Sequence, residues 1–177
     1  MAARNTPETP LRYDRYMLIR LAREDDLAAI DEIYNHYVAR STCTYQYEPT
    51  TPAQRLAWFR AHDAEHPVTV AISDGGVVGW GALSWFRERE GYRFTVENTV
   101  YVRPDQHRRG IGRALLADLI ERARTLGHRT IIAGISAEQD ASVALHTTFG
   151  FAEVARMRRV GFKFDQWLDV VFLQLML

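Results

Sequence analysis

Apolar and polar positions alternate with two different periods along this chain, and the changes of period predict its elements. Apolar residues recur every three to four positions in four segments, which predicts helices over 24–40, 51–65, 111–126 and 140–148. Runs of apolar and β-branched residues bounded by turn-forming residues predict about seven strands, over 17–21, 68–72, 77–85, 94–102, 130–135, 153–161 and 167–175. Three strands in a row precede the third helix, and a single strand separates it from the fourth.

This order predicts an α+β fold: a central mixed, twisted sheet with helices on both faces. The strand over 130–135 is expected to run parallel to the strand over 94–102, because a helix connects them. A chain of 177 residues with 47% hydrophobic residues is long enough for one core and short for two. One domain is therefore expected over residues 17–177, preceded by a flexible N-terminal extension over 1–16.

Charge and cysteine content narrow the class of protein. Lys+Arg and Asp+Glu are balanced at 22 each, so no global field favours nucleic acid or an anionic membrane as a partner. The single cysteine, Cys43, allows no internal disulfide, and no base adjacent in sequence would activate it, which favours a packing role. No apolar stretch is long enough to span a membrane and the first residues lack the apolar segment of a secretory signal, so a cytoplasmic location is expected.

A basic, glycine-bearing turn at 103–113 joins the strand over 94–102 to the third helix. Gly110 and Gly112 would let the backbone approach a ligand closely, and the free N–H groups and dipole of the helix N-terminus favour an anion there. The turn therefore predicts a phosphate site, although a solvated basic turn is the alternative from these residues alone. Two better-known phosphate motifs are excluded: the only lysine, Lys163, is far downstream, and Leu115 stands where a G-x-G-x-x-G motif needs glycine.

With this turn, five further segments make the chain resemble the GNAT superfamily of N-acetyltransferases, and within it the phosphinothricin and methionine sulfoximine acetyltransferase branch. The superfamily pattern Q/R-x-x-G-x-G/A falls on residues 107–112, and the resemblance covers nearly the whole chain from Met17 onward. Two positions depart from what relatives usually carry: His107 stands where the superfamily pattern has Gln or Arg, and Gln139 stands where relatives of the branch usually have an asparagine that contacts coenzyme A. The five segments are 33–37, 91–97, 133–138, 144–146 and 160–170.

The resemblance implies the GNAT fold, in which the strands over 94–102 and 130–135 splay apart to bind acetyl-CoA as cosubstrate. It also implies direct transfer in a ternary complex to a small amino-acid-like acceptor, no metal, and a homodimer. On these grounds the residues expected to bind acetyl-CoA are Val100, Tyr101, Val102, Arg108, Arg109, Gly110, Ile111, Gly112, Arg113, Gln139 and Ser142.

Acetyl transfer to an amine requires a group that removes a proton from the ammonium and a proton for the leaving thiolate. The resemblance implies Glu97 as the base; periodicity alone would place it on the polar face of a half-exposed strand. His146 occupies the position of the tyrosine that protonates the thiolate in many relatives, and a helix histidine bonded to a nearby carbonyl is the alternative.

Recognition of the acceptor is expected to fall on an arginine loop and two tyrosines. Arg87 and Arg93 could bind the acceptor carboxylate, because guanidinium and carboxylate pair bidentately, and Tyr45 and Tyr47 could line the side-chain pocket. A solvated loop with no ligand is the other interpretation of these arginines.

Two alternatives remain at this stage, and a third is set aside. The acceptor could be another amine, such as a protein N-terminus or a polyamine. The chain could be a catalytically silent acyl-CoA-binding sensor, although the presence of Glu97 argues against this. His62 and His66 fit the H-x-x-E-H spacing of zinc peptidases, but Pro67 ends the helix and no third ligand is evident, so no metal site is expected.

Overall fold

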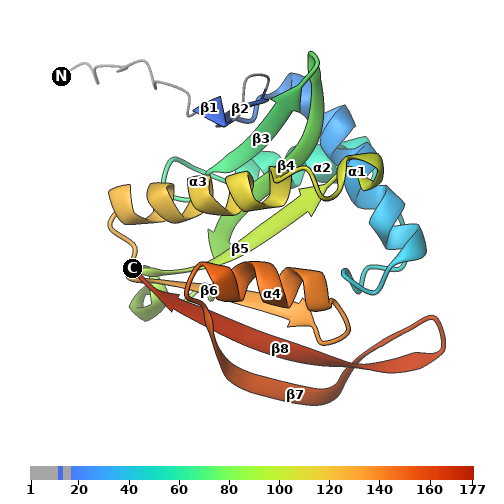
Figure 1. Cartoon of the computed structure of the whole chain (residues 1–177), viewed down its shortest axis with the longest axis vertical. Helices are drawn as coiled ribbons and strands as arrows, with labels where there is room; N and C mark the ends of the chain where they lie inside the picture. Colours follow the sequence, from blue (N-terminus) through green and yellow to red (C-terminus); the bar gives the residue numbers. More distant parts are fainter. Residues whose placement is uncertain (1–11, 14–16) are drawn as a thin grey trace.

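The computed structural model describes residues 12–13 and 17–177. These residues form one eight-stranded mixed sheet in the order β1-β2-β3-β4-β5-β6-β8-β7 (Figure 1). Only the β5–β6 pair is parallel, as predicted. The strands are β1 (Arg12–Tyr13), β2 (Met17–Leu21), β3 (Val68–Ser73), β4 (Gly76–Trp85), β5 (Thr95–Val102), β6 (Thr130–Ser136), β7 (Ala152–Lys163) and β8 (Gln166–Met176).

The short strand β1 adds an eighth strand to the seven predicted. It pairs antiparallel with β2 and lies within the segment expected to be a flexible extension. The rest of that extension lies outside the described residues.

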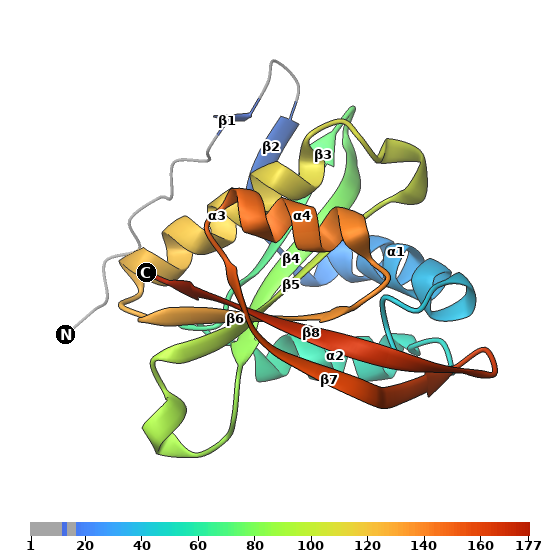
Figure 2. The same cartoon turned by 60° about the horizontal axis from the view of Figure 1, so that its bottom comes forward.

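The helices cover both faces of the sheet (Figure 2). α3 and α4 lie on one face over a core that includes Leu116, Leu119 and Ile131, and α1 and α2 lie on the other over Val70 and Trp80. The bounds are α1 (Leu27–Arg40), α2 (Pro52–Ala61), α3 (Ile111–Thr125) and α4 (Asp140–Thr148), with 3-10 turns η1 (Glu24–Asp26), η2 (Glu90–Tyr92) and η3 (Pro104–Gln106).

Local hydrogen bonds set the ends of two helices. The first predicted helix begins with a 3-10 turn, because Asp26 turns its carboxylate onto Arg20 and the Arg23 amide. α2 begins with a capping box between Thr51 and Gln54, as its sequence predicts. It ends at Ala61 and not near residue 65, because His62 is extended and bonds the carbonyl of Trp58.

The central feature of the sheet is the separation of β5 from β6. The two strands pair only at Thr95, Val96 and Glu97 of β5. Beyond Glu97, β5 stays paired with β4 and β6 stays paired with β8, so the sheet opens between them. This opening is the splayed site that the resemblance implied.

The β7–β8 hairpin is tied to the loop between α1 and α2 by a buried lysine. Lys163 is 1% exposed, and its Nζ donates to the backbone carbonyls of Ser41 at 2.8 Å and Thr44 at 2.7 Å. Tyr45 of the same loop packs on Gly161, where any Cβ would collide with the tyrosine ring. The β7–β8 hairpin thus holds the loop between α1 and α2 in place.

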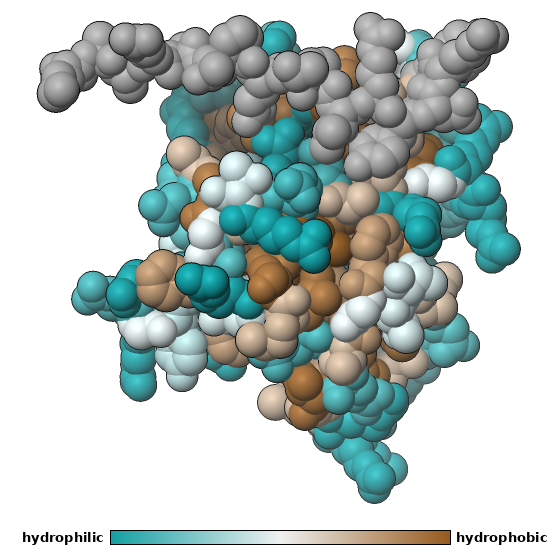
Figure 3. All heavy atoms as spheres, turned by 60° about the vertical axis from the view of Figure 1, so that its left-hand side comes forward, coloured by the Kyte–Doolittle hydropathy of each residue, from teal (hydrophilic) through white to brown (hydrophobic). Residues whose placement is uncertain are grey.

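The outer surface carries mixed polarity. On the face shown in Figure 3, apolar side chains are visible at the centre, framed by hydrophilic ones. Within the described part of the chain, no helix combines the length and hydropathy needed to cross a bilayer.

Candidate functional site

A cleft of about 560 Å³ occupies the opening between β5 and β6. Its walls come from β5, from β6, from the turn before α3 and from α4. All of the residues predicted to bind acetyl-CoA line it except Arg109, and Glu97 and His146 line it as well. The fold therefore assembles most of the predicted site from four separate segments of the chain.

Backbone direction determines which residues of β5 form the open edge. A Cβ added at Gly79 or Gly81 of β4 would lie 2.9 Å from the carbonyl of Tyr101 and 3.1 Å from that of Thr99, so these carbonyls face β4. Backbone groups alternate along a strand, so Val100 and Val102 face the opening. Tyr101, one of the residues expected to bind acetyl-CoA, turns its backbone groups toward β4 and offers no free backbone edge to the opening.

The turn before α3 has the backbone geometry of an anion cradle. Arg108 and Gly110 both adopt positive φ, of 64° and 79°, and Gly110 is the N-cap of α3. At Gly112 a Cβ would lie 3.5 Å from Leu145 and 3.6 Å from Val102, which are ordinary contacts. The fold itself would accept a methyl group at Gly112, so a glycine there leaves room for a ligand.

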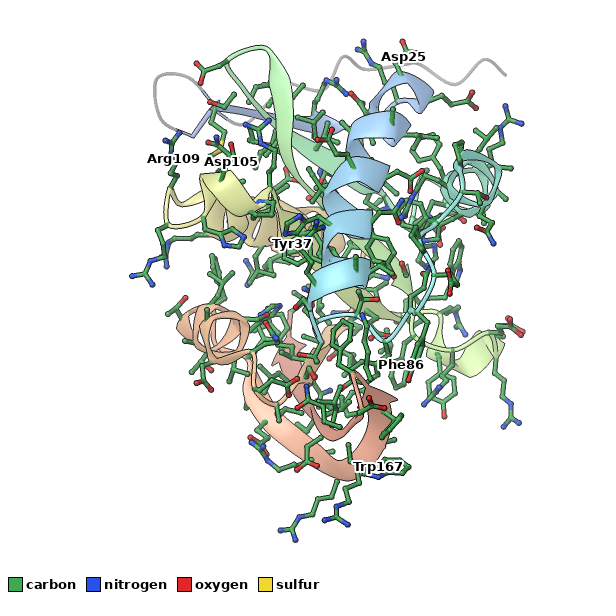
Figure 4. The ribbon with its side chains drawn as sticks, turned by 90° about the vertical axis from the view of Figure 1, so that its right-hand side faces the viewer. Asp25, Tyr37, Phe86, Asp105, Arg109 and Trp167 are labelled. Carbon is green, nitrogen blue, oxygen red and sulfur yellow. The ribbon has the colours of Figure 1, made fainter. Side chains whose placement is uncertain are left out.

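The three arginines of this turn lie differently. Arg113 packs its guanidinium 5.1 Å from the ring centre of Phe149 and, like Arg108, lines the cleft. Arg109 does not line it: its Nη1 donates to Gln106 at 2.9 Å. In Figure 4 it lies at the outer side of the turn near Asp105, well away from Tyr37.

His107, which departs from the superfamily pattern, binds the turn to α1. Its Nε2 is 2.7 Å from the hydroxyl of Tyr37, and the two rings stack at an angle of 14°. Tyr37 donates in turn to the carbonyl of Val102, and burial raises the pKa of Tyr37 to about 12. His107 thus has a structural contact that its sequence position did not indicate, and Val102 keeps only its N–H free for the opening.

Glu97 lies at the last paired position of β5, where the opening begins. Burial raises the pKa of its carboxyl group, and the positive charge of Arg87 opposes that rise. A Cβ added at Gly134 would lie 3.2 Å from Oε1 of Glu97, so this glycine of β6 makes room for the carboxylate. A half-buried carboxylate of raised pKa at the edge of a cleft has the character of a general base.

His146 is buried, and both of its ring nitrogens have partners. Nδ1 lies 2.8 Å from the carbonyl of Ser142, and Nε2 lies 2.9 Å from Nδ2 of Asn98. Burial lowers the pKa of His146. The partners match a ring whose Nδ1–H donates to the carbonyl of Ser142 and whose Nε2 accepts from Asn98. This geometry favours the alternative in which the histidine bonds a helix carbonyl. Asn98 also lines the cleft, and the sequence analysis did not predict it.

The four residues predicted to bind the acceptor are not gathered in one place. Arg87 acts electrostatically on Glu97, whereas Arg93 is exposed and donates to the carbonyl of Glu90 at 3.4 Å. Tyr45 bonds Ser136 of the cleft at 2.8 Å. Tyr47 is 60% exposed and donates to the carbonyl of Phe162 in the hairpin. Arg87 and Tyr45 are therefore the two predicted acceptor residues that interact with a residue lining the cleft.

Gln139 and the candidate zinc ligands have protein partners. Gln139 lines the cleft, is the N-cap of α4, and donates to Thr42 at 3.2 Å. His62 contacts the hydroxyl of Ser84, and His66 contacts Asp63. Across residues 12–13 and 17–177, no group of three or more His, Cys, Asp or Glu side chains is placed to hold a metal ion.

Comparison with known proteins gives the family of this chain. The model of the acetyltransferase (GNAT) family matches residues 30–151, which include all of β5, the turn and α4. The chain belongs to the GNAT family of acetyltransferases. The predicted family and fold class are thereby confirmed.

Within the GNAT family, the chain is similar to enzymes of the predicted branch. It is 43% identical over 162 residues to the L-amino acid N-acyltransferase MnaT of Escherichia coli, covering 91% of this chain and 94% of that one. It is 41% identical, over 91% of this chain and 95% of the other, to an L-methionine sulfoximine/L-methionine sulfone acetyltransferase of Salmonella typhimurium. It is 36% identical to a phosphinothricin N-acetyltransferase of Alcaligenes faecalis, with 96% and 90% covered.

Two similar GNAT structures were solved with acetyl-CoA. An acetyltransferase from Salmonella typhimurium superposes with a TM-score of 0.88 at 40% identity, over 92% of this chain and 94% of the other. A phosphinothricin acetyltransferase from Sinorhizobium meliloti superposes with a TM-score of 0.86 at 37% identity, over 92% and 89%. GNAT acetyltransferases thus bind acetyl-CoA on the fold that this chain adopts.

Proposed function

We propose that this GNAT protein transfers the acetyl group of acetyl-CoA to the amino group of a small amino-acid-like acceptor of the phosphinothricin, methionine sulfoximine or methionine sulfone type. The observation that carries the proposal is Glu97, a carboxyl group of raised pKa at the point where β5 leaves β6. The names of the related enzymes support the acceptor class.

The cleft fits acetyl-CoA in its own geometry. The positive-φ turn at Arg108 and Gly110 directs the free N–H groups of α3 outward, and Gly112 leaves space above them, which suits a pyrophosphate. The open edge at Val100 and Val102 can pair with the amides of an extended arm, as the edge of a sheet pairs with an added strand. Bound acetyl-CoA supplies the activated acetyl group.

Glu97 then makes the acceptor reactive. An amino acid carries an ammonium group at neutral pH, and its nitrogen lone pair is free only after a proton has left. Glu97 accepts that proton, directly or through one water, and the amine can attack the thioester carbon in the ternary complex. The carbon–sulfur bond breaks as the new carbon–nitrogen bond is completed, and the thiolate must gain a proton.

We propose that His146 positions α4 and does not itself supply that proton. Its only ring proton is donated to the carbonyl of Ser142, and its other nitrogen accepts from Asn98. His146→Gln should therefore lower kcat less than loss of Glu97 does. Loss of kcat as large as that caused by Glu97→Gln would restore the acid role for His146.

A thiol-release assay tests the function. The protein with acetyl-CoA should release free thiol when phosphinothricin, methionine sulfoximine or methionine sulfone is added, and mass spectrometry should show the acceptor heavier by one acetyl group. Release only with a polyamine or a peptide N-terminus would support the alternative of another amine. Tight binding of acetyl-CoA with no release for any acceptor would support the sensor and refute the enzyme.

We also propose a homodimer formed through the β7–β8 hairpin. Within the described chain β7 is an edge strand, and Val154, Met157 and Val160 expose apolar side chains along it. Light scattering should give twice the chain mass of 20.4 kDa, and Val154→Glu with Met157→Glu should reduce it to 20.4 kDa. A mass of one chain for the unmodified protein at all concentrations would contradict the dimer.

A further inference from the structure

A second cavity, of about 480 Å³, lies between the sheet and helices α1 and α2. Thr99 and Tyr101 of β5 form part of its floor, with Trp80 and Ser84 of β4. Side chains alternate between the two faces of a strand, so this floor faces away from Asn98 and His146. The cavity is therefore on the opposite side of β5 from the histidine.

Arg55 of α2 forms one wall of this cavity and carries unused hydrogen-bond donors. It is 4% exposed, and its Nε donates to Asp31 at 2.8 Å. Its guanidinium carbon lies 4.7 Å from the ring centre of Trp58 and 4.9 Å from that of Tyr34. Among the described residues neither terminal nitrogen has a hydrogen-bond partner. A guanidinium has five N–H donors, so four remain available in a mostly aromatic enclosure.

The cavity adjoins the proposed base. β4 and β5 pair Ser84 with Glu97 and Ala82 with Thr99, and directly paired residues share a face of the sheet. Glu97 therefore lies at the end of the floor next to Ser84, and Thr99 lines both the cavity and the acetyl-CoA cleft. A molecule in the cavity can present one end to Glu97 while its other end reaches toward Arg55.

We propose that this cavity is a subsite for the side chain of the acceptor, with Arg55 donating to a strongly polarised oxygen at its end. The inference rests on the proposed function and adds to it a second binding group for the same acceptor. Asp31 already balances the charge of Arg55, so the subsite offers hydrogen bonds without net positive charge. An uncharged, oxygen-bearing group such as a sulfone or sulfoximine is therefore preferred over a carboxylate, which would lie close to Asp31.

Arg55→Lys tests the subsite, because lysine keeps the charge opposite Asp31 and loses the forked donors. The quantity to measure is kcat/KM for methionine sulfone relative to methionine, which has the same chain without the oxygens. The unmodified protein should prefer the sulfone, and Arg55→Lys should reduce that preference by about ten- to a hundredfold. The KM for acetyl-CoA should stay unchanged. Arg60→Lys, five residues further along α2 in an exposed pair with Glu24, is the matched control.

A measurement on the unmodified protein covers the case in which Arg55→Lys does not fold. The indole N–H signal of Trp58, assigned with Trp58→Phe, should shift when methionine sulfone is titrated in. The signal of Trp167, which is 62% exposed at the far end of the hairpin, should not.

Three results would overturn the subsite, and they separate its failure from failure of the proposed function. An unchanged preference in folded Arg55→Lys, or an unmoved Trp58 signal in a protein that acetylates the sulfone, would refute the subsite alone. A protein that acetylates neither amino acid would overturn the proposed function and the subsite together.

Discussion

At the scale of the residue, two opposing effects set the chemistry of Glu97. Burial raises the pKa of its carboxyl group, which makes the carboxylate a stronger base, while Arg87 holds the rise in check. Gly134 of β6 has no Cβ, and this leaves room for the carboxylate of Glu97 on β5. The role proposed for Glu97 depends on both neighbours.

Glu97→Gln removes the proton acceptor and keeps the shape. We expect kcat to fall by about 10²- to 10⁴-fold while acetyl-CoA affinity is retained, because glutamine cannot take the proton. Raising the pH should partly restore the rate, since the amine then loses its proton to solvent. Steady-state kinetics and calorimetry measure the two quantities, and near-normal kcat at neutral pH would exclude Glu97 as the base.

Arg87→Gln should move the acid limb of the pH–rate profile. Glu97 accepts a proton only when ionised, so activity falls as the pH drops through its pKa, which lies above the ordinary 4.5. Removing the positive charge of Arg87 takes away a lowering effect, so the limb should move to higher pH, and the acceptor KM should rise. Arg93→Gln is the control, because Arg93 does not contribute to the pKa of Glu97. An identical shift in both variants would show that the loop acts as a whole.

At the scale of the element, the turn between β5 and α3 combines backbone strain with open space. Positive φ at Arg108 is unfavourable for a non-glycine residue, and the contact of His107 with Tyr37 helps hold this turn against α1. Gly112 is the second residue of α3, where alanine would be the better helix former. The turn is therefore less stable than a regular start of a helix would be, and its backbone is open to a ligand.

Gly112→Ala should separate folding from binding. The new methyl group makes only ordinary contacts with Leu145 and Val102, so unfolding should cost the same or up to about 1 kcal/mol more. Acetyl-CoA affinity should nevertheless fall, because the methyl occupies space above the free N–H groups. Thermal denaturation and calorimetry follow the two effects. Gly91→Ala, in open space outside the cleft, is the control, and unchanged affinity in Gly112→Ala would argue against the cradle.

At the scale of the whole molecule, the site is closed by parts that are far apart in the sequence. Lys163 in the β7–β8 hairpin holds the loop at Ser41 and Thr44, and Tyr45 of that loop reaches Ser136 at the end of β6. The proposed acceptor side of the cleft thus depends on the β7–β8 hairpin packing against the loop between α1 and α2.

Lys163→Met should loosen this closure. Methionine keeps the apolar stem but leaves two backbone carbonyls without their donor, which should cost roughly 2 kcal/mol or more in the free energy of unfolding. The acceptor KM should rise more than the KM for acetyl-CoA, because the loop borders the acceptor side. Urea denaturation and kinetics measure these effects. Arg156→Met, in an exposed pair on the same hairpin, should change neither, and equal behaviour of the two variants would contradict the anchoring role.

The role of Glu97 as a base was implied by the family resemblance and stays a prediction. The sequence alone was sufficient for the order of the four helices and of seven of the eight strands in the described residues, for the parallel β5–β6 unit and for the basic glycine turn. These features are local, because periodicity, helix caps and turn residues depend on neighbours along the chain. The five segments that resemble the GNAT superfamily are likewise short stretches of sequence. The start of the first helix and the end of α2 were less predictable. They depend on hydrogen bonds of the Asp26 and His62 side chains that the helical pattern does not show.

Only the tertiary structure decided which residues meet. Asn98 against His146, Lys163 against the α1–α2 loop, and Arg55 above the floor of β4 and β5 join segments tens of residues apart. It also distinguished Arg87, whose charge acts on Glu97, from Arg93, which bonds the carbonyl of Glu90. The two arginines look alike in the sequence. The physical reason is that pattern and propensity determine the face on which a side chain lies. Burial, hydrogen-bond partners and pKa arise only when distant faces pack together.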